Sequence, residues 1–116
     1  MILTVAERIK LLSLLPTAGD YATLKILHQL RMSMSLTEDE FKKWGIVNDP
    51  EKQMVFFEEN GEAEIPIGEK ATGIIVDKLR ELDKQGELDI EAVSVYEKFI
   101  PPPPLSSYSI VGMNFS

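Results

Sequence analysis

Cysteine is absent from this chain of 116 residues, and histidine occurs once, at His28. The missing cysteines exclude disulfide scaffolds, thiolate zinc sites, iron–sulfur clusters and cysteine nucleophiles. A single histidine cannot form a multi-histidine metal site within one chain. Apolar runs are only a few residues long, too short for a transmembrane helix. Met1–Thr4 lacks the basic start of a signal peptide. We therefore expect a cytoplasmic protein that uses no cofactor.

Basic residues are also few. Twelve Lys and Arg stand against 19 Asp and Glu, which gives a formal net charge of −7. This balance argues against nucleic acid or an anionic membrane as the partner, because both are bound by clustered Lys and Arg. The charge is uneven: residues 1–34 carry four bases and two acids, residues 35–70 carry four bases and ten acids, and residues 100–116 carry no charge.

Local signals predict helices in the first half of the chain. Thr4 and Glu7 have the spacing of a capping box, and the helix that follows should end before Pro16. Asp20 can cap a second helix, expected over about residues 21–34.

A third helix is expected over about residues 38–44. Thr37 and Glu40 form a second capping box at its start. Gly45 is placed to end the helix in the left-handed conformation.

Residues 53–67 are predicted to form a β-hairpin about Asn60-Gly61, a dipeptide that favours a type I′ turn. Successive side chains alternate between the two faces of a strand. The predicted core face consists of Met54, Phe56, Ala63, Ile65 and Ile67. The other face needs a cover from this chain or from another, and it consists of Val55, Phe57 and Pro66. Proline cannot donate a ladder hydrogen bond, so the second strand should lie at a sheet edge.

Two further helices are expected, over about residues 69–84 and 90–99. Pro101–Pro104 then form a stiff polyproline spacer of about 12 Å. The last twelve residues carry no charge, whereas a disordered tail is normally polar and charged. Their sizeable apolar side chains, besides Leu105, are Tyr108, Ile110, Val111, Met113 and Phe115. This segment could dock on its own domain or on a second copy, and the sequence leaves both open.

Together these patterns predict an α+β fold. We expect a mostly helical single domain of about five helices with one β-hairpin over residues 1–100. An extended, proline-rich C-terminal arm should follow over residues 101–116.

Residues that could carry chemistry lack the partners that such chemistry needs. His28 has no serine, aspartate or lysine that the spacing assigns to it. Gly68–Gly73 has the glycine spacing of a phosphate loop but continues with two isoleucines instead of Lys and Ser/Thr. Carboxylates within residues 58–64 could bind a divalent cation or share a proton, but an Asn-Gly turn splays its side chains outward. We predict a protein that is not an enzyme and has no metal site.

The order of elements could suggest a winged helix-turn-helix. The would-be recognition helix begins Glu38-Asp39-Glu40, which would face phosphates. The electrostatics therefore argue against nucleic acid as the partner.

Four stretches resemble small proteins encoded by tailed bacteriophages and prophages: Thr4–Pro16, Gly19–Ile26, Gly68–Thr72 and Tyr96–Phe99. The resemblance covers about residues 4–99 and leaves the arm outside. Such proteins carry no assigned activity, so the resemblance implies no catalytic residues. It implies a cytoplasmic phage product or a virion component.

The leading hypothesis is a non-catalytic interaction or assembly module that binds itself or a phage or host protein, with a homo-oligomer through the arm as one form. The expected contact residues are Val55, Phe57, Pro66, Tyr108, Ile110, Met113 and Phe115. The alternative is a small acidic inhibitor of a host enzyme, which would present carboxylates in place of nucleic-acid phosphates. Salt separates the two, because only the second should weaken steeply with ionic strength.

Overall fold

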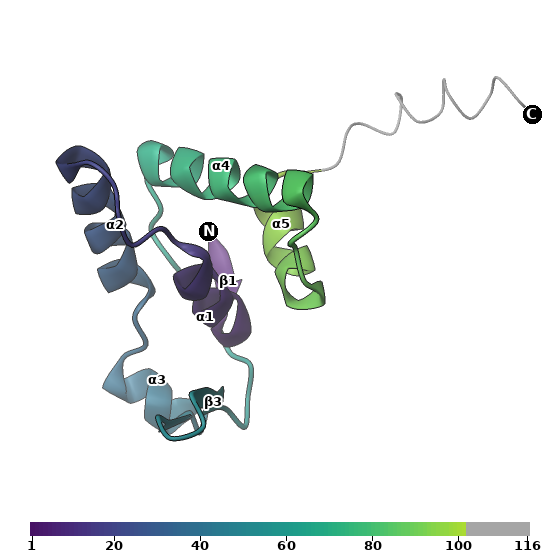
Figure 1. Cartoon of the computed structure of the whole chain (residues 1–116). Helices are drawn as coiled ribbons and strands as arrows, with labels where there is room; N and C mark the ends of the chain where they lie inside the picture. The colour runs from purple at the N-terminus through teal and green to yellow at the C-terminus, as the bar shows by residue number, and fades with distance from the viewer. Residues whose placement is uncertain (102–116) are drawn as a thin grey trace, which may run out of the picture.

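The computed structural model describes residues 1–101, and the predicted contact residues Tyr108, Ile110, Met113 and Phe115 lie outside them. The helices of this part are α1 (Val5–Leu14), α2 (Tyr21–Met34), α3 (Glu38–Lys43), α4 (Glu69–Gln85), the short 3₁₀ helix η1 (Ile90–Ala92) and α5 (Val93–Phe99) (Figure 1). The strands are β1 (Ile2–Thr4), β2 (Val47–Asp49), β3 (Met54–Phe56) and β4 (Glu62–Glu64). The predicted α+β class, dominated by helix, is confirmed.

Both predicted capping boxes are present. Thr4 Oγ1 accepts a hydrogen bond from the Glu7 amide at 3.1 Å, and Glu7 Oε1 accepts one from the Thr4 amide at 2.9 Å. Thr37 and Glu40 repeat the arrangement at the start of α3, with the same two distances. Each box satisfies amides that the first turn of a helix leaves without a partner.

The predicted helix ends are also in place. Gly45 and Gly86 have φ values of 59° and 69°, the left-handed conformation that a helix terminus commonly requires. The Glu87 amide then donates to the Leu82 carbonyl at 2.8 Å, which closes the last turn of α4.

The predicted hairpin over residues 53–67 is wrong in its pairing, although both of its strands exist. β3 pairs antiparallel with β2, and β4 pairs antiparallel with β1, so β3 and β4 belong to different two-stranded sheets. The hairpin of the described fold is therefore β2–β3. Pro66 follows the end of β4 and is not part of an edge strand, as the sequence had suggested.

The reason lies at Gly61, which does not adopt the positive φ of a type I′ turn. A Cβ at this position would lie 1.9 Å from Trp44 Cε2, so the backbone here passes directly against the indole. The Trp44 carbonyl accepts hydrogen bonds from the Glu58 and Glu59 amides at 3.0 and 3.1 Å. Contact with the buried Trp44 thus overrides the local turn preference of Asn60-Gly61.

The faces of β3 are also the reverse of the prediction. Met54 and Phe56, predicted as core, are 51% and 45% exposed, whereas Val55 and Phe57 are partly buried. Val55 and Phe57 pack against a second core cluster made by Val5, Trp44 and Ile46. Only the β4 side of the prediction holds, since Ile65 is buried and Ala63 and Ile67 are partly buried in the main core.

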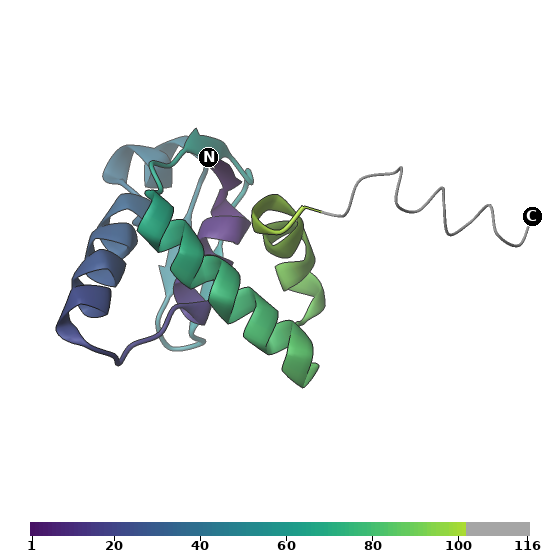
Figure 2. The ribbon, with the colours of Figure 1, turned by 90° about the horizontal axis from the view of Figure 1, so that it is seen from above.

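The main core lies where the helices meet. Its fully or nearly fully buried members are Leu3, Leu11, Leu15, Leu27, Leu30, Met34, Ile65, Ala71, Ile75, Leu79, Val95 and Phe99. Figure 2 shows α4 running across the molecule with α2 on one side and α5 on the other. Within residues 1–101, no helix is long and apolar enough to cross a membrane.

Candidate functional site

Val55 and Phe57, two of the predicted contact residues, come together beside the outward side of α1. They line a depression of about 450 Å³ with Ile9, Lys10 and Glu91, among other residues. The site is therefore built from β3, α1 and η1, rather than from the outer face of a hairpin over residues 53–67.

A second depression of about 280 Å³ adjoins the first, because Ile9 and Val55 line both. Its further apolar lining is Leu12 of α1, Leu36, which precedes the α3 cap Thr37, and Phe41 of α3. We call the combined surface the α1 groove and define it by Ile9, Leu12, Leu36, Phe41, Val55 and Phe57. These six residues are aliphatic or aromatic, while Lys10, Ser13, Ser35, Asn48 and Glu91 supply the polar part of the same two depressions. The apolar part suits an apolar segment more than a charged ligand.

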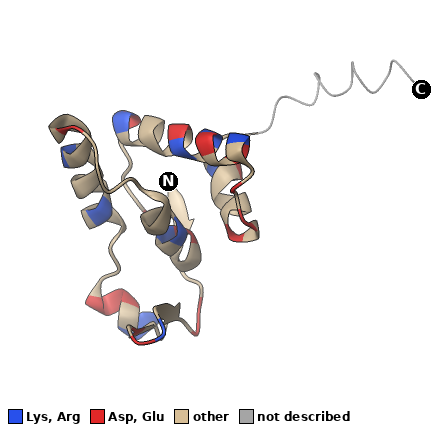
Figure 3. Ribbon diagram, in the orientation of Figure 1, with Lys and Arg blue, Asp and Glu red and all other residues tan. Residues whose placement is uncertain are grey.

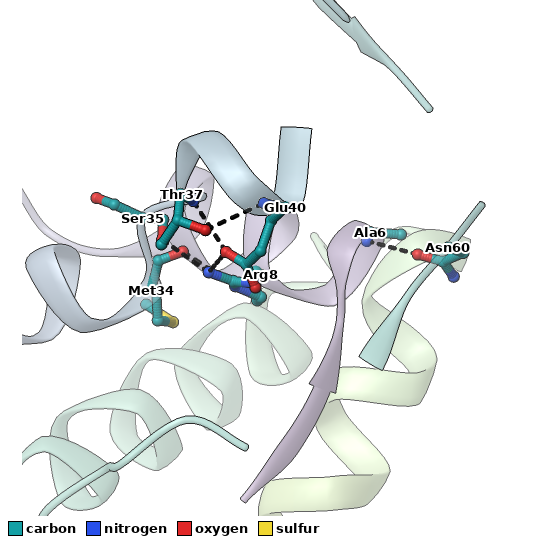
Figure 4. A network of polar contacts seen from close by, with 7 residues as sticks. All are labelled: Ala6, Arg8, Met34, Ser35, Thr37, Glu40 and Asn60. Carbon is teal, nitrogen blue, oxygen red and sulfur yellow. Dashed lines mark hydrogen bonds and ion pairs between the residues drawn. The ribbon is translucent and has the colours of Figure 1, made fainter. Parts of the chain in front are cut away.

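The walls of the groove are held by Arg8, which lies on α1 and is 2% exposed (Figure 4). Arg8 Nη1 and Nη2 donate to the two carboxylate oxygens of Glu40 at 2.7 and 3.1 Å. Arg8 Nε donates to the Met34 carbonyl at 3.1 Å, and Nη2 donates to the Ser35 carbonyl at 2.7 Å. One side chain therefore ties α1 to the end of α2 and to the start of α3.

The charge of this buried guanidinium is matched by Glu40. Hydrogen bonding from Arg8 lowers the pKa of the Glu40 carboxyl, which burial opposes and the Thr37 amide reinforces. The ion pair is bidentate, the geometry in which arginine and carboxylate interact most strongly. α1 and α3, which carry Ile9 and Phe41, are thereby fixed relative to each other.

The start of α1 is held by a separate set of contacts. The Val5 amide donates to the Gly61 carbonyl at 3.0 Å, and the Ala6 amide donates to Asn60 Oδ1 at 2.9 Å (Figure 4). Together with the capping box, these bonds satisfy the first amides of the helix. Asn60 is thus a capping residue for α1, and this use of its side chain replaces the turn that the sequence suggested.

Glu7 extends the network towards α5. Burial raises the pKa of the Glu7 carboxyl. Hydrogen bonds from Lys98 and the Thr4 amide together lower it by more than burial raises it, so the pKa is below its ordinary value. Lys98 Nζ lies 2.6 Å from Glu7 Oε1 and 2.9 Å from the Ile2 carbonyl. Lys98 therefore joins α5 to both β1 and α1.

Pro66 is not brought to this groove. It is exposed and lines a separate depression of about 510 Å³ between α2 and the start of α4, with Ile26, Leu30 and Ala71 among its neighbours. The three predicted contact residues within residues 1–101, Val55, Phe57 and Pro66, are therefore divided between two surfaces of the molecule.

The carboxylates of residues 58–64 are spread over different elements. Glu64 Oε1 accepts from the Met1 ammonium group at 3.0 Å, and Glu62 lies opposite Thr4 in the β1–β4 ladder. Among residues 1–101, no group of three or more His, Asp or Glu side chains is arranged to hold a metal ion. His28 is exposed on α2.

Comparisons with known proteins give no relative: no family model, no curated protein and no solved structure matches the chain. The resemblance to phage-encoded proteins therefore stays a prediction.

Proposed function

We propose that the protein is a non-catalytic protein–protein interaction or assembly module. The α1 groove is its binding surface, and the observation that carries the proposal is the apolar lining shared by the two adjoining depressions around Ile9 and Val55. Such a lining favours a partner segment that is apolar and carries little charge.

The C-terminal segment of the chain itself, residues 105–116, has that chemistry. It contains no charged residue and includes four of the predicted contact residues, Tyr108, Ile110, Met113 and Phe115. The segment that binds the groove can belong to the same copy of the chain or to a second copy. In both cases the groove recognises a part of its own chain.

The length of the chain also permits this contact. Glu91 lines the first of the two depressions, and only about nine helical residues, or roughly 14 Å, separate it from Ile100. Residues 102–116 can span up to about 50 Å when fully extended. The segment can therefore reach the groove of its own copy or that of a neighbour.

The test is direct binding of a synthetic peptide of residues 102–116 to a chain ending at Pro101. Trp44 is the only tryptophan and packs in the cluster that Val55 and Phe57 join, so its fluorescence reports binding. Val55→Asp should weaken binding at least tenfold. Val47→Asp is the matched control, because Val47 is 60% exposed and its ladder partner is Phe56 on the outer face of β3.

Light scattering of the full chain and the shortened chain then separates the two sources of the segment. A mass that falls on shortening indicates exchange between copies. Peptide binding with an unchanged monomer mass indicates docking within one copy. Absence of peptide binding, or equal binding by the Val55→Asp and Val47→Asp variants, would contradict the proposal.

A further inference from the structure

A second surface, on α2, is unpartnered in the described part of the chain. Tyr21, Lys25, His28 and Met32 are all exposed, with Tyr21 at 79% and Met32 at 65%. Their spacing of four, three and four residues places them on one face of the helix, over roughly 16 Å. We call these four residues the α2 stripe. The stripe thus carries one large exposed side chain with apolar surface at each end, Tyr21 and Met32.

The α2 stripe also differs in charge from the rest of this acidic chain. α2 is the one helix of residues 1–101 without an Asp or Glu. The nearest acid, Asp20, precedes the helix and accepts a hydrogen bond from the Thr23 amide at 2.7 Å. Lys25 forms no ion pair with any residue that the structure describes. The stripe therefore fits a surface that is both apolar and acidic.

Such a surface lies on η1 and α5. Residues 87–97 contain four acids and no Lys or Arg. Asp89 is paired with Lys10, and Lys98, which follows directly, is paired with Glu7, so Glu87, Glu91 and Glu97 are the acids of this stretch outside the ion pairs of the described residues. Ile90 is 87% exposed and Val93 is 49% exposed. Glu97, also exposed, follows them at a spacing that puts all three on one face. We call Ile90, Val93 and Glu97 the α5 knob.

The two surfaces lie on opposite sides of the molecule. In Figures 1 and 2, α2 and α5 flank α4 on its two sides, and Figure 3 shows Lys and Arg but no Asp or Glu within α2 itself. The stripe and the knob of one copy therefore cannot meet each other, whereas those of two copies can.

We propose that the α2 stripe of one copy binds the α5 knob of a second copy, with Lys25 facing Glu97 and the apolar side chains of the two surfaces packed beside that pair. Pairing of like surfaces is disfavoured, because two stripes would place cations together and two knobs would place Glu97 beside its equivalent. The contact is thus heterologous, and its repetition builds a ring or an open row of copies. It uses neither the α1 groove nor the C-terminal segment.

The contact is small, so the association is weak. Four residues on one side and three on the other fall short of the roughly 1,000 Å² that stable interfaces bury. The average mass of the full chain should therefore rise steadily with protein concentration and fall with added salt.

Sedimentation velocity of full-length charge variants tests the contact. Lys25→Glu and Glu97→Lys each place like charges across it and should weaken association at least tenfold. Lys52→Glu and Glu51→Lys are matched controls, because they make the same charge changes in the exposed β2–β3 turn and should leave association unchanged.

Mixing gives the sharper result. When Lys25→Glu and Glu97→Lys chains are combined, every contact between unlike copies is complementary, so association should return. The Lys25→Glu/Glu97→Lys double variant should also associate on its own.

Four outcomes would overturn the proposal: a wild-type chain that stays monomeric at all concentrations, single variants that behave like their controls, a mixture that stays dispersed, or a Lys25→Glu variant that associates more strongly. Circular dichroism of each variant confirms that these exposed positions leave the fold intact. The groove variant Val55→Asp leaves the α2 stripe and the α5 knob unchanged, so the association that it retains should still depend on Lys25 and Glu97, whereas association through the groove should be lost. Failure of this contact is thus distinguishable from failure of the groove.

Discussion

Replacing Gly61 with alanine should destabilise the protein sharply. The added Cβ would lie 1.9 Å from Trp44 Cε2 and 2.3 Å from both Cδ2 and Cζ2. Carbon atoms in favourable contact are about 3.5–4.0 Å apart, so the ring or the backbone must move by roughly 1.5–2 Å. Trp44 is 5% exposed in a cluster with Val5 and Ile46, which leaves no room for that shift without repacking.

The magnitude follows from two limits. Overpacking a core costs about 1–3 kcal/mol, and losing the packing of a buried tryptophan altogether costs about 3–5 kcal/mol. The backbone change alone would stabilise by about 0.4–1 kcal/mol, because Gly61 does not need a positive φ. We therefore expect Gly61→Ala to lower the free energy of unfolding by about 3 kcal/mol.

Urea denaturation followed by Trp44 fluorescence and by circular dichroism measures this loss. The folded Gly61→Ala variant should also show a red-shifted emission, because the displaced indole meets water. Gly73→Ala is the control: Gly73 is exposed within α4 with nothing within 4 Å of an added Cβ, so alanine should stabilise by about 0.5–1 kcal/mol.

A double-mutant cycle with Trp44→Leu locates the effect. If the indole is the cause, Gly61→Ala should cost much less in the Trp44→Leu background. The reasoning is refuted if Gly61→Ala unfolds within 0.5 kcal/mol of the wild type with unchanged emission, or if its cost is the same in both backgrounds.

Two further substitutions and one pH titration test the buried ion pair and a helix terminus. Arg8→Met leaves the Glu40 carboxylate without its partner and should lower the free energy of unfolding by about 3 kcal/mol. Urea titration measures this loss, and a loss below about 1 kcal/mol would contradict the assigned role. Because the pKa of Glu40 is lower in the folded state, its contribution is complete above the unfolded pKa of about 4.3 and is lost as the pH falls towards the folded pKa. The deficit of Arg8→Met relative to the wild type should therefore shrink below about pH 4, and a constant difference from pH 7 to pH 3 would argue against this linkage. Gly86→Ala places alanine at a φ of 69°, with no atom crowding its Cβ. The backbone strain alone should lower the free energy of unfolding by about 1 kcal/mol. Thermal unfolding measures this loss, and an unchanged melting temperature would refute the prediction.

Features set by a few neighbouring residues could be predicted from the sequence. The capping boxes at Thr4 and Thr37 and the left-handed termini at Gly45 and Gly86 depend on contacts within one turn of helix. The chemistry that produces them is therefore complete in the local sequence.

Strand pairing could not be predicted in the same way. Asn60-Gly61 favours a hairpin locally, but β4 pairs with β1, some sixty residues earlier, in a segment of three residues with no strand signal of its own. The choice is made by Trp44, whose ring occupies the space beside Gly61. A glycine needed for close approach and a glycine needed for a turn look the same in a sequence.

The candidate site was predicted in part for a related reason. Alternation correctly separated Val55 and Phe57 from Met54 and Phe56, but it does not say which set faces inward, since that depends on the cover that α1 supplies. Arg8 gave no signal either, because its partner Glu40 lies 32 positions along the chain. The two surfaces of the further proposal were visible only once exposure was known.

The pairing of β1 with β4 has a consequence for the order in which the chain becomes native during synthesis. Ile2 is translated 62 positions before its register partner Glu64. At about 5–20 residues per second, the ribosome needs roughly 3–12 s to supply that partner. For that interval Leu3 and Val5, both fully buried in the finished fold, have no strand to lie against. β1 is thus among the last elements to be completed although it precedes the rest of the fold, and a nascent chain stalled before Glu62 would display these side chains to chaperones.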